Sequence, residues 1–170
     1  MIRIAITGPE SSGKTTLSLA LGQVYQVNVI PEYARNYLEL QNGNYTFEDL
    51  EKIAQGQLDE WIRQDSPQIC DTEMTVIKIW SEVKYGKISP LLKELYEAQR
   101  VDHYFLCRPD IPWEPDPLRE HPEERDQLFA FYKEELTKMS RSFTIIHGSL
   151  EERMEQCFGI INTKFPLFKK

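Results

Sequence analysis

A short segment near the start of the chain has the composition of a phosphate-binding loop. It runs from Gly8 to Thr15 as GPESSGKT and matches the spacing G-x-x-x-x-G-K-[ST]. Glycine lets the backbone curl so that its N–H groups point at an anion, and a helix that begins at the loop adds its positive N-terminal end. Lys14 supplies a mobile charge for the outer phosphates, and the Thr15 hydroxyl is suited to Mg²⁺. The segment predicts binding of a nucleoside triphosphate with Mg²⁺ by a loop that contains Gly8, Glu10, Ser11, Ser12, Gly13, Lys14 and Thr15.

Two carboxylates stand where predicted strands end. Glu32 follows the strand predicted at 27–30, and Asp71 follows the one at 68–70. In a parallel sheet the carboxyl ends of the strands form the ligand crevice. Asp71 is therefore a candidate to hold Mg²⁺, and Glu32 to accept the proton of an attacking hydroxyl. The plainer alternatives are an N-cap for Asp71, a solvent-facing position for Glu32, and a surface position for Arg35, which otherwise pairs with Glu32 or holds substrate.

A proline-rich segment precedes the helix predicted to begin at residue 122. Five of the ten prolines fall within residues 109–122, together with Trp113 and Arg119. Loops of this length in compact domains are usually functional or disordered. We expect a lid over roughly residues 108–122, with a solvated surface loop as the alternative. Arg108 and Arg119 are the expected lid cations, because phosphoryl transfer spreads negative charge that an arginine can meet.

Three tryptophans and a further arginine call for separate interpretations. Trp113 in the lid is suited to stack on a flat base, above all a cationic one, and its alternative is a plug that packs the lid onto the core. Trp61 and Trp80 fall on apolar helical stripes, which predicts core positions for both. Arg125 is predicted to lie on a helix surface.

The elements that must position these residues alternate between strands and helices. Short β-branched or apolar runs predict strands at residues 2–7, 27–30, 68–70, 103–107 and 143–146. Apolar stripes at helical spacing predict helices at residues 14–24, 47–61, 74–85, 90–99, 122–139 and 150–161. Thr46 and Ser89 are expected N-caps, and Ser149 to Glu152 is an expected capping box. This alternation predicts an α/β fold with a mainly parallel sheet covered by helices on both faces.

Composition bounds the class of protein. The 170 residues predict a single domain over residues 1–170. Asp and Glu number 27 against 20 Lys and Arg, a net charge of −7, which disfavours a nucleic-acid partner. No apolar run approaches the ~18 residues of a membrane span. The three cysteines form no C-x-x-C pair and fit a reducing compartment, and the first residues lack a signal-peptide pattern, so we expect a cytoplasmic protein.

The class of nucleotide-dependent protein is narrowed by motifs that are missing from the sequence. A GTPase needs a guanine-reading N-K-x-D and a D-x-x-G switch, and neither is found. Motor ATPases and helicases usually need a larger chain and a nucleic-acid surface. A chain of this length with an arginine-bearing lid suits a small-molecule kinase, because lid closure excludes the water that competes as phosphoryl acceptor.

Four marks, in this order along the chain, resemble the ribosylnicotinamide kinase domain of the NadR type, within the P-loop nucleoside and nucleotide kinases. They are the loop Gly8 to Thr15 with E-S-S inside it, the segment P-E-Y-A-R at 31–35, C-D-T-E at 70–73, and a tryptophan lid from Trp113 to P-L-R at 117–119. The loop by itself is shared by many families, whereas the ordered set is more specific. The resemblance covers almost the whole chain.

The resemblance implies a P-loop fold with a five-stranded parallel sheet in the order 2-3-1-4-5. It implies phosphorylation of the ribose hydroxyl of nicotinamide riboside by ATP, giving nicotinamide mononucleotide. Gly8 to Thr16 would hold the phosphates of ATP, with Thr16 following the loop motif. One of Glu32 and Asp71 would be the base, and both would hold ribose hydroxyls and Mg²⁺. The turn at Gly148 and Ser149 would approach the adenine. The remaining expected substrate contacts are Tyr33, Arg35, Trp113 and Asp116.

Two other functions stay open at this point. The chain is alternatively a kinase of another nucleoside or nucleotide, or a nonenzymatic ATP-binding regulatory module. The expected partner is a small-molecule nucleoside, with a homo-oligomer left open and with no nucleic acid or membrane partner.

Overall fold

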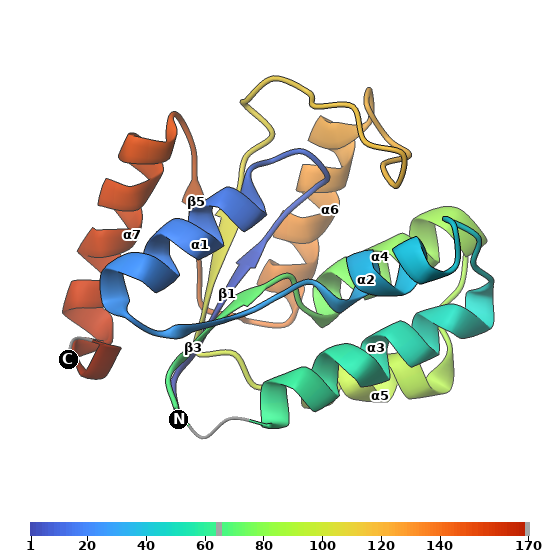
Figure 1. Ribbon diagram of the computed structural model, residues 1–170, viewed down its shortest axis with the longest axis horizontal. Helices are drawn as coiled ribbons and strands as arrows, with labels where there is room; N and C mark the ends of the chain where they lie inside the picture. The colour runs from blue at the N-terminus through green and yellow to red at the C-terminus, as the bar shows by residue number, and fades with distance from the viewer. Residues whose placement is uncertain (64–65, 169–170) are drawn as a thin grey trace.

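A parallel five-stranded sheet forms the centre of the computed structural model, which describes residues 1–63 and 66–168 (Figure 1). The strands are β1 (Arg3–Thr7), β2 (Asn28–Ile30), β3 (Gln68–Asp71), β4 (His103–Cys107) and β5 (Phe143–Ile146). Their order is β2-β3-β1-β4-β5, and every neighbouring pair is parallel. This confirms the predicted sheet and the order that the resemblance implied.

Helices cover both faces of the sheet because alternate residues of each strand point to opposite sides. On one face Ile4 and Ile6 pack with α1 (Lys14–Tyr25) and α7 (Leu150–Lys164). On the other face Ala5 packs with residues of α4 (Met74–Tyr85) and α6 (Arg125–Lys138). The three-layer α/β architecture expected from the alternating pattern is therefore present.

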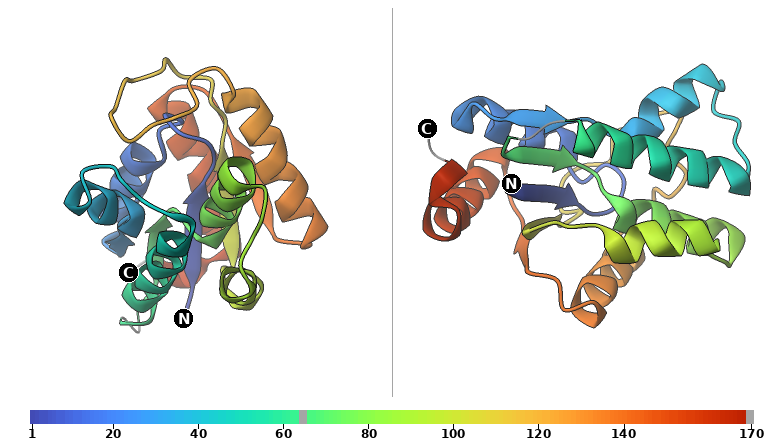
Figure 2. Two further views of the ribbon diagram at one scale, coloured as in Figure 1. Left: turned by 90° about the vertical axis from the view of Figure 1, so that its right-hand side faces the viewer. Right: turned by 90° about the horizontal axis from the view of Figure 1, so that it is seen from below.

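A second group of helices extends to one side of the sheet (Figures 1 and 2). It contains α2 (Tyr33–Leu40), α3 (Phe47–Ile62) and α5 (Pro90–Ala98), which share an apolar cluster with α4. The expected caps are present at Thr46, Ser89 and Ser149. The short 3₁₀ helix η1 (Pro166–Phe168) follows α7.

Three local predictions differ from the structure. No helix was predicted at residues 33–40. Helix α2 there has only eight residues, and two of them, Ala34 and Leu38, are buried. Helix α6 begins at Arg125 instead of Pro122, and the amides of Glu120 and His121, just before Pro122, donate to the Glu10 carboxylate of the P-loop. The N-cap of α4 is Glu73, whose carboxylate accepts from the Thr75 amide at 2.7 Å, so the N-cap interpretation of Asp71 was wrong.

The lid, residues 108–122, contains no helix or strand and passes over the loop between β1 and α1 (Figures 1 and 2). In the described part of the chain, none of the helices is long and apolar enough to cross a membrane. The single domain expected over residues 1–170 includes positions 64, 65, 169 and 170, which lie outside the described residues.

Candidate active site

The backbone of the loop between β1 and α1 is tightly curved. Gly8 has φ +135°, and a Cβ there would lie 2.7 Å from the carbonyl oxygen of Cys107 on the neighbouring strand. Gly13, the N-cap of α1, has φ +80°. The Ser12 hydroxyl and the Lys14 ammonium both donate to the carbonyl oxygen of Pro9, each at 2.7 Å. Glycine is required at these two positions because L side chains rarely adopt such angles and no space exists at Gly8.

Arg153 of α7 fixes the outer side of this loop, and the sequence analysis missed it. Its guanidinium is buried and donates to the carbonyl oxygens of Ser12 at 2.5 Å and Arg108 at 3.0 Å. It also donates to the carbonyl of Gly148 at 2.8 Å and forms an ion pair with Asp110 at 2.5 Å. One side chain thus joins the phosphate loop, the start of the lid and the turn before α7. The signal was its spacing, four residues before the buried Cys157 on the inward face of the helix.

Glu32 is positioned by a buried glutamine on α3. Gln57 accepts from the amide of Tyr33 at 2.9 Å and donates to the carbonyl of Pro31 at 3.2 Å, so it holds the residues on both sides of Glu32. Burial raises the pKa of the Glu32 carboxyl, which Lys14 opposes and Asp71 reinforces. Half-buried at the N-cap of α2, Glu32 faces the cavity described below.

Asp71, at the end of β3, fits the chemistry of a magnesium site. Burial raises its pKa, while hydrogen bonding from the Thr15 hydroxyl and the charge of Lys14 lower it. Its Oδ1 atom is buried with no hydrogen-bond partner in residues 1–63 and 66–168. A carboxylate oxygen with a free acceptor beside a threonine hydroxyl matches the oxygen ligands that Mg²⁺ prefers. In these ranges no group of three or more His, Cys, Asp or Glu side chains is placed to hold a metal ion.

The lid is attached to the phosphate loop by several hydrogen bonds. The Glu10 carboxylate accepts from the amides of Glu120 at 3.0 Å and His121 at 3.1 Å. The Ser11 hydroxyl accepts from the amide of Glu114 at 2.9 Å. The E-S-S letters of the loop therefore contact the lid, in addition to any role toward a phosphate.

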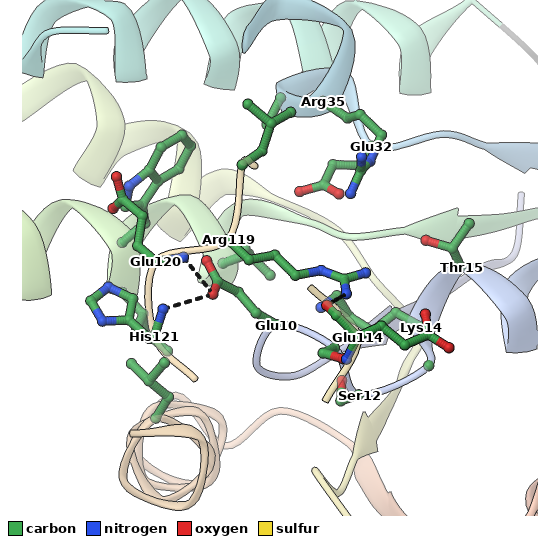
Figure 3. Close-up of a pocket in the computed structure, with 18 of the residues that line it drawn as sticks. Glu10, Ser12, Lys14, Thr15, Glu32, Arg35, Glu114, Arg119, Glu120 and His121 are labelled. Atoms are coloured by element: carbon green, nitrogen blue, oxygen red, sulfur yellow. Dashed lines mark hydrogen bonds between the residues drawn. The ribbon is translucent and has the colours of Figure 1, made fainter. Parts of the chain in front are cut away.

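The two expected lid arginines lie in different places. Arg119 lines the cavity and its guanidinium donates to the carbonyl oxygen of Glu114 (Figure 3). Arg108 is exposed, and its guanidinium lies 5.5 Å from the centre of the Phe129 ring, away from the cavity lining. Of these two arginines, Arg119 lines the cavity together with the phosphate loop, and Arg108 does not.

Two guanidinium groups lie near the ring of Trp113. Arg119 and Arg125 are 5.8 Å and 5.7 Å from its ring. The indole is half-buried and does not line the cavity. Arg125 also donates to the carbonyl oxygens of Ser11 at 3.0 Å and Ile111 at 3.1 Å, so the prediction of a helix-surface role for Arg125 was wrong. It occupies the first position of α6, which directs it back toward the lid.

Of the remaining expected contacts, only Arg35 is among the residues that line the cavity. Arg35 lines it and is paired with Asp116 of the lid at 3.0 Å. Tyr33 packs instead against α3, where a Cβ on Gly56 would lie 2.3 Å from its ring. Gly148 donates its amide to Asp110 at 2.8 Å. Ser149 caps α7, and neither it nor Gly148 lines the cavity.

The cavity joins the phosphate loop, the end of β2 and the lid (Figure 3). Thr15 and Lys14 lie at one side of the view and Glu120 and His121 at the other, with Arg119 between them. The second side contains two aromatic residues that the sequence analysis did not place in the site, Tyr45 and Trp80. Trp61 is a core residue as predicted, 1% exposed, whereas Trp80 is half-buried and faces the cavity.

The fold, the curled glycine loop and the helix after it define a P-loop nucleotide-binding protein. A protein-family profile described as an AAA domain matches residues 3–153. The chain therefore belongs to this AAA-domain family.

Two curated proteins are similar to this chain in sequence. The chain is 28% identical over 124 residues to the trifunctional NAD biosynthesis/regulator protein NadR of Escherichia coli K12, and equally to that of Salmonella typhimurium LT2. These matches cover 68% of this chain and 30% of each relative, so the chain spans less than a third of the curated proteins that it matches.

Solved structures show the same fold. A NadR protein in complex with NR has a TM-score of 0.78 at 18% identity, over 96% of this chain and 51% of that one. Deoxyadenosine kinase from M. mycoides has a TM-score of 0.67 at 15% identity, over 95% of this chain and 100% of that one.

Proposed function

We propose that the protein is an ATP-dependent kinase that phosphorylates the ribose hydroxyl of nicotinamide riboside, giving nicotinamide mononucleotide. One observation carries the proposal: the phosphate loop, the Glu32 carboxylate and Arg119 of the lid all face one cavity. The similarity to NadR supports the choice of acceptor, since a NadR structure of the same fold is described as a complex with NR. The similarity to a deoxyadenosine kinase supports a nucleoside as the acceptor class.

The proposed phosphate site consists of the loop amides, Lys14 and the N-terminus of α1. Lys14 reaches the outer phosphates of ATP once its ammonium leaves the Pro9 carbonyl, which it contacts at 2.7 Å. Thr15 and Asp71 would hold Mg²⁺, which offsets phosphate charge when it is bound. The turn at Gly148 and Ser149 is the proposed approach to the adenine, and Arg153 connects that turn to the loop.

Glu32 is the proposed base. Because burial raises its pKa, the carboxylate is a stronger proton acceptor than an exposed glutamate. As the sugar hydroxyl forms its bond to the outer phosphorus, its proton moves to Glu32, and the bond to ADP breaks. Asp71 does not line the cavity, which favours Glu32 over Asp71 for this role.

Arg119 is proposed to meet the negative charge that develops on the transferred group. The lid excludes water, which would otherwise accept the phosphoryl group. Arg35 and Asp116 link α2 to the lid across the proposed sugar site, so substrate binding and lid closure are expected to be coupled.

A panel of nucleosides with Mg-ATP, scored by ADP release and by mass of the product, tests this function. We expect nicotinamide riboside to give the highest kcat/KM and a product one phosphate heavier. If a purine or pyrimidine nucleoside is turned over best, the protein is a nucleoside kinase with an acceptor other than nicotinamide riboside. ATP binding with no transfer to any nucleoside would favour the nonenzymatic regulatory module.

A further inference from the structure

The end of the cavity opposite the phosphate loop is aromatic and apolar. Tyr45 comes from the segment between α2 and α3, Trp80 from α4 and Glu120 from the lid. Figure 3 places Glu120 far from Thr15, at the other side of the pocket. The aliphatic residues of the cavity lining are Ala34, Leu38, Val76, Ile79, Val83, Ile111, Leu118 and Leu128. Such a surface suits a flat ring better than a phosphate or a sugar.

The two aromatic rings are held in place before any ligand binds. The Trp80 Nε1 donates to the Tyr45 hydroxyl at 2.8 Å, and the ring centres are 4.7 Å apart at 65°. The Tyr45 hydroxyl also lies 3.1 Å from Glu120 Oε2. Lys84 completes the group with an ion pair to Glu120 at 2.7 Å. Because these contacts fix the rings, a base that stacks there meets little entropic cost of ordering them.

The charges at this end favour a cation. The ammonium of Lys84 lies 3.9 Å from the centre of the Tyr45 ring, so the structure already places a positive group on this aromatic surface. Lys84 does not line the cavity, whereas Tyr45 and Trp80 do. At this end Glu10 and Glu120 carry two negative charges against the one of Lys84. Of the other cations in the cavity lining, Arg35 is paired with Asp116, and the Arg119 guanidinium donates to the Glu114 carbonyl oxygen. A planar base with a positive charge is therefore favoured over an anionic group.

We propose that Tyr45, Trp80 and Glu120 form the base subsite of the acceptor nucleoside and select a planar base, with a preference for a cationic, pyridinium-type ring. This inference rests on the proposed kinase function. It moves base recognition away from Trp113, whose ring has two guanidinium groups near it and lies outside the cavity lining. The substrate then lies along the cavity, with its hydroxyl beside Glu32 and its base under Glu120.

Kinetics on two forms of one substrate test the subsite. Nicotinamide riboside carries a positive ring, and its reduced form is neutral with a closely similar shape. We expect Trp80→Leu to raise KM about tenfold for both forms and to leave KM for ATP unchanged, because stacking is lost for both. Glu120→Gln is expected to raise KM about fivefold for the cationic form only. Glu123→Gln, an exposed neighbour outside the cavity, is the matched control.

Several outcomes overturn the proposal. If Trp113→Leu raises the nucleoside KM more than Trp80→Leu does, base recognition lies at Trp113. If Glu120→Gln affects the two forms equally, the preference for a cation is lost. Where Trp80→Leu lowers Tm strongly, the Glu120→Gln comparison decides, since Glu120 is exposed. If the wild-type protein phosphorylates no nucleoside, the kinase function fails and the subsite fails with it; if it phosphorylates them and the variants match wild type, only the subsite fails.

Discussion

The phosphate loop and the lid meet at the same cavity but are held in different ways. The loop is fixed by hydrogen bonds to its own carbonyl oxygens: the buried Ser12 and the half-buried Lys14 bond to one, and the buried Arg153 bonds to another. The lid lacks helix and strand, and its residues are exposed or half-buried. The loop is therefore expected to keep its shape without ligand, whereas the lid can open by exchanging a few hydrogen bonds for water.

The rigid side of this comparison is tested by Lys14→Ala. We expect at least a thousandfold loss of kcat/KM for phosphoryl transfer, because a positioned charge is lost where negative charge develops. Thermal stability is expected to change little, since Lys14 is half-buried and gives up one hydrogen bond. Lys133→Ala, at an exposed position of α6, is the control. Activity within tenfold of wild type would remove Lys14 from the mechanism.

The second test is Glu32→Gln, which is expected to lower activity and to raise stability. We expect Glu32→Gln to lower kcat about a hundredfold, the usual contribution of a general base. Because burial raises the pKa of Glu32, its ionised form destabilises the fold at neutral pH. The variant should therefore be more stable there, by ~1 kcal/mol or a few degrees in Tm.

The ionisation of Glu32 predicts the direction in which stability and kcat change with pH. Folding favours the protonated carboxyl, so the stability contribution of Glu32 is present at low pH and is lost as pH rises through its raised pKa. The Tm gap between the variant and wild type should widen as pH rises from the ordinary glutamate pKa to the raised pKa of Glu32, stay constant above it, and close at lower pH. Wild-type kcat should fall as pH drops through the same value. Glu94→Gln, exposed on α5, should show neither effect.

Within the lid, the two arginines Arg119 and Arg108 are expected to differ in their effect on kcat. We expect Arg119→Ala to lower kcat about thirtyfold, since Arg119 lines the cavity. Arg108→Ala should change kcat less than threefold, since its guanidinium lies over Phe129 instead. Steady-state kinetics at saturating ATP measure both. A larger effect at Arg108 would mean that the lid reorganises on closure.

The smallest expected effect concerns the attachment of the lid to the loop. Glu10→Gln weakens two hydrogen bonds from the amides of Glu120 and His121, because a neutral acceptor replaces a carboxylate. We expect cleavage within residues 108–122 by a dilute protease to become about fivefold faster, which corresponds to ~1 kcal/mol. Glu123→Gln should leave the rate unchanged. Equal rates for Glu10→Gln would show that other contacts hold the lid.

The phosphate loop, the sheet and most helix ends were readable from the sequence because they depend on local rules. Glycine at 8 and 13, the caps at Thr46 and Ser149, and β-branched runs act within a few residues of themselves. The prediction was wrong at Arg125, where the partner is Ser11, far away along the chain. It also missed Arg153, Tyr45 and Trp80, which face the site only after distant elements pack together.

The sequence by itself determined that a phosphate-binding turn follows a strand and precedes a helix, because spacing and glycine content decide that geometry locally. Only the tertiary structure decided which charged and aromatic side chains share the cavity with that turn. Arg119 and Arg108 are alike in sequence terms, yet one lines the cavity and the other lies over Phe129. The physical reason is that the path of the lid depends on contacts with Glu10 and Ser11 of the phosphate loop, to which Arg125 also bonds. These residues precede their lid partners and Arg125 by more than a hundred positions, so no local pattern encodes the contacts.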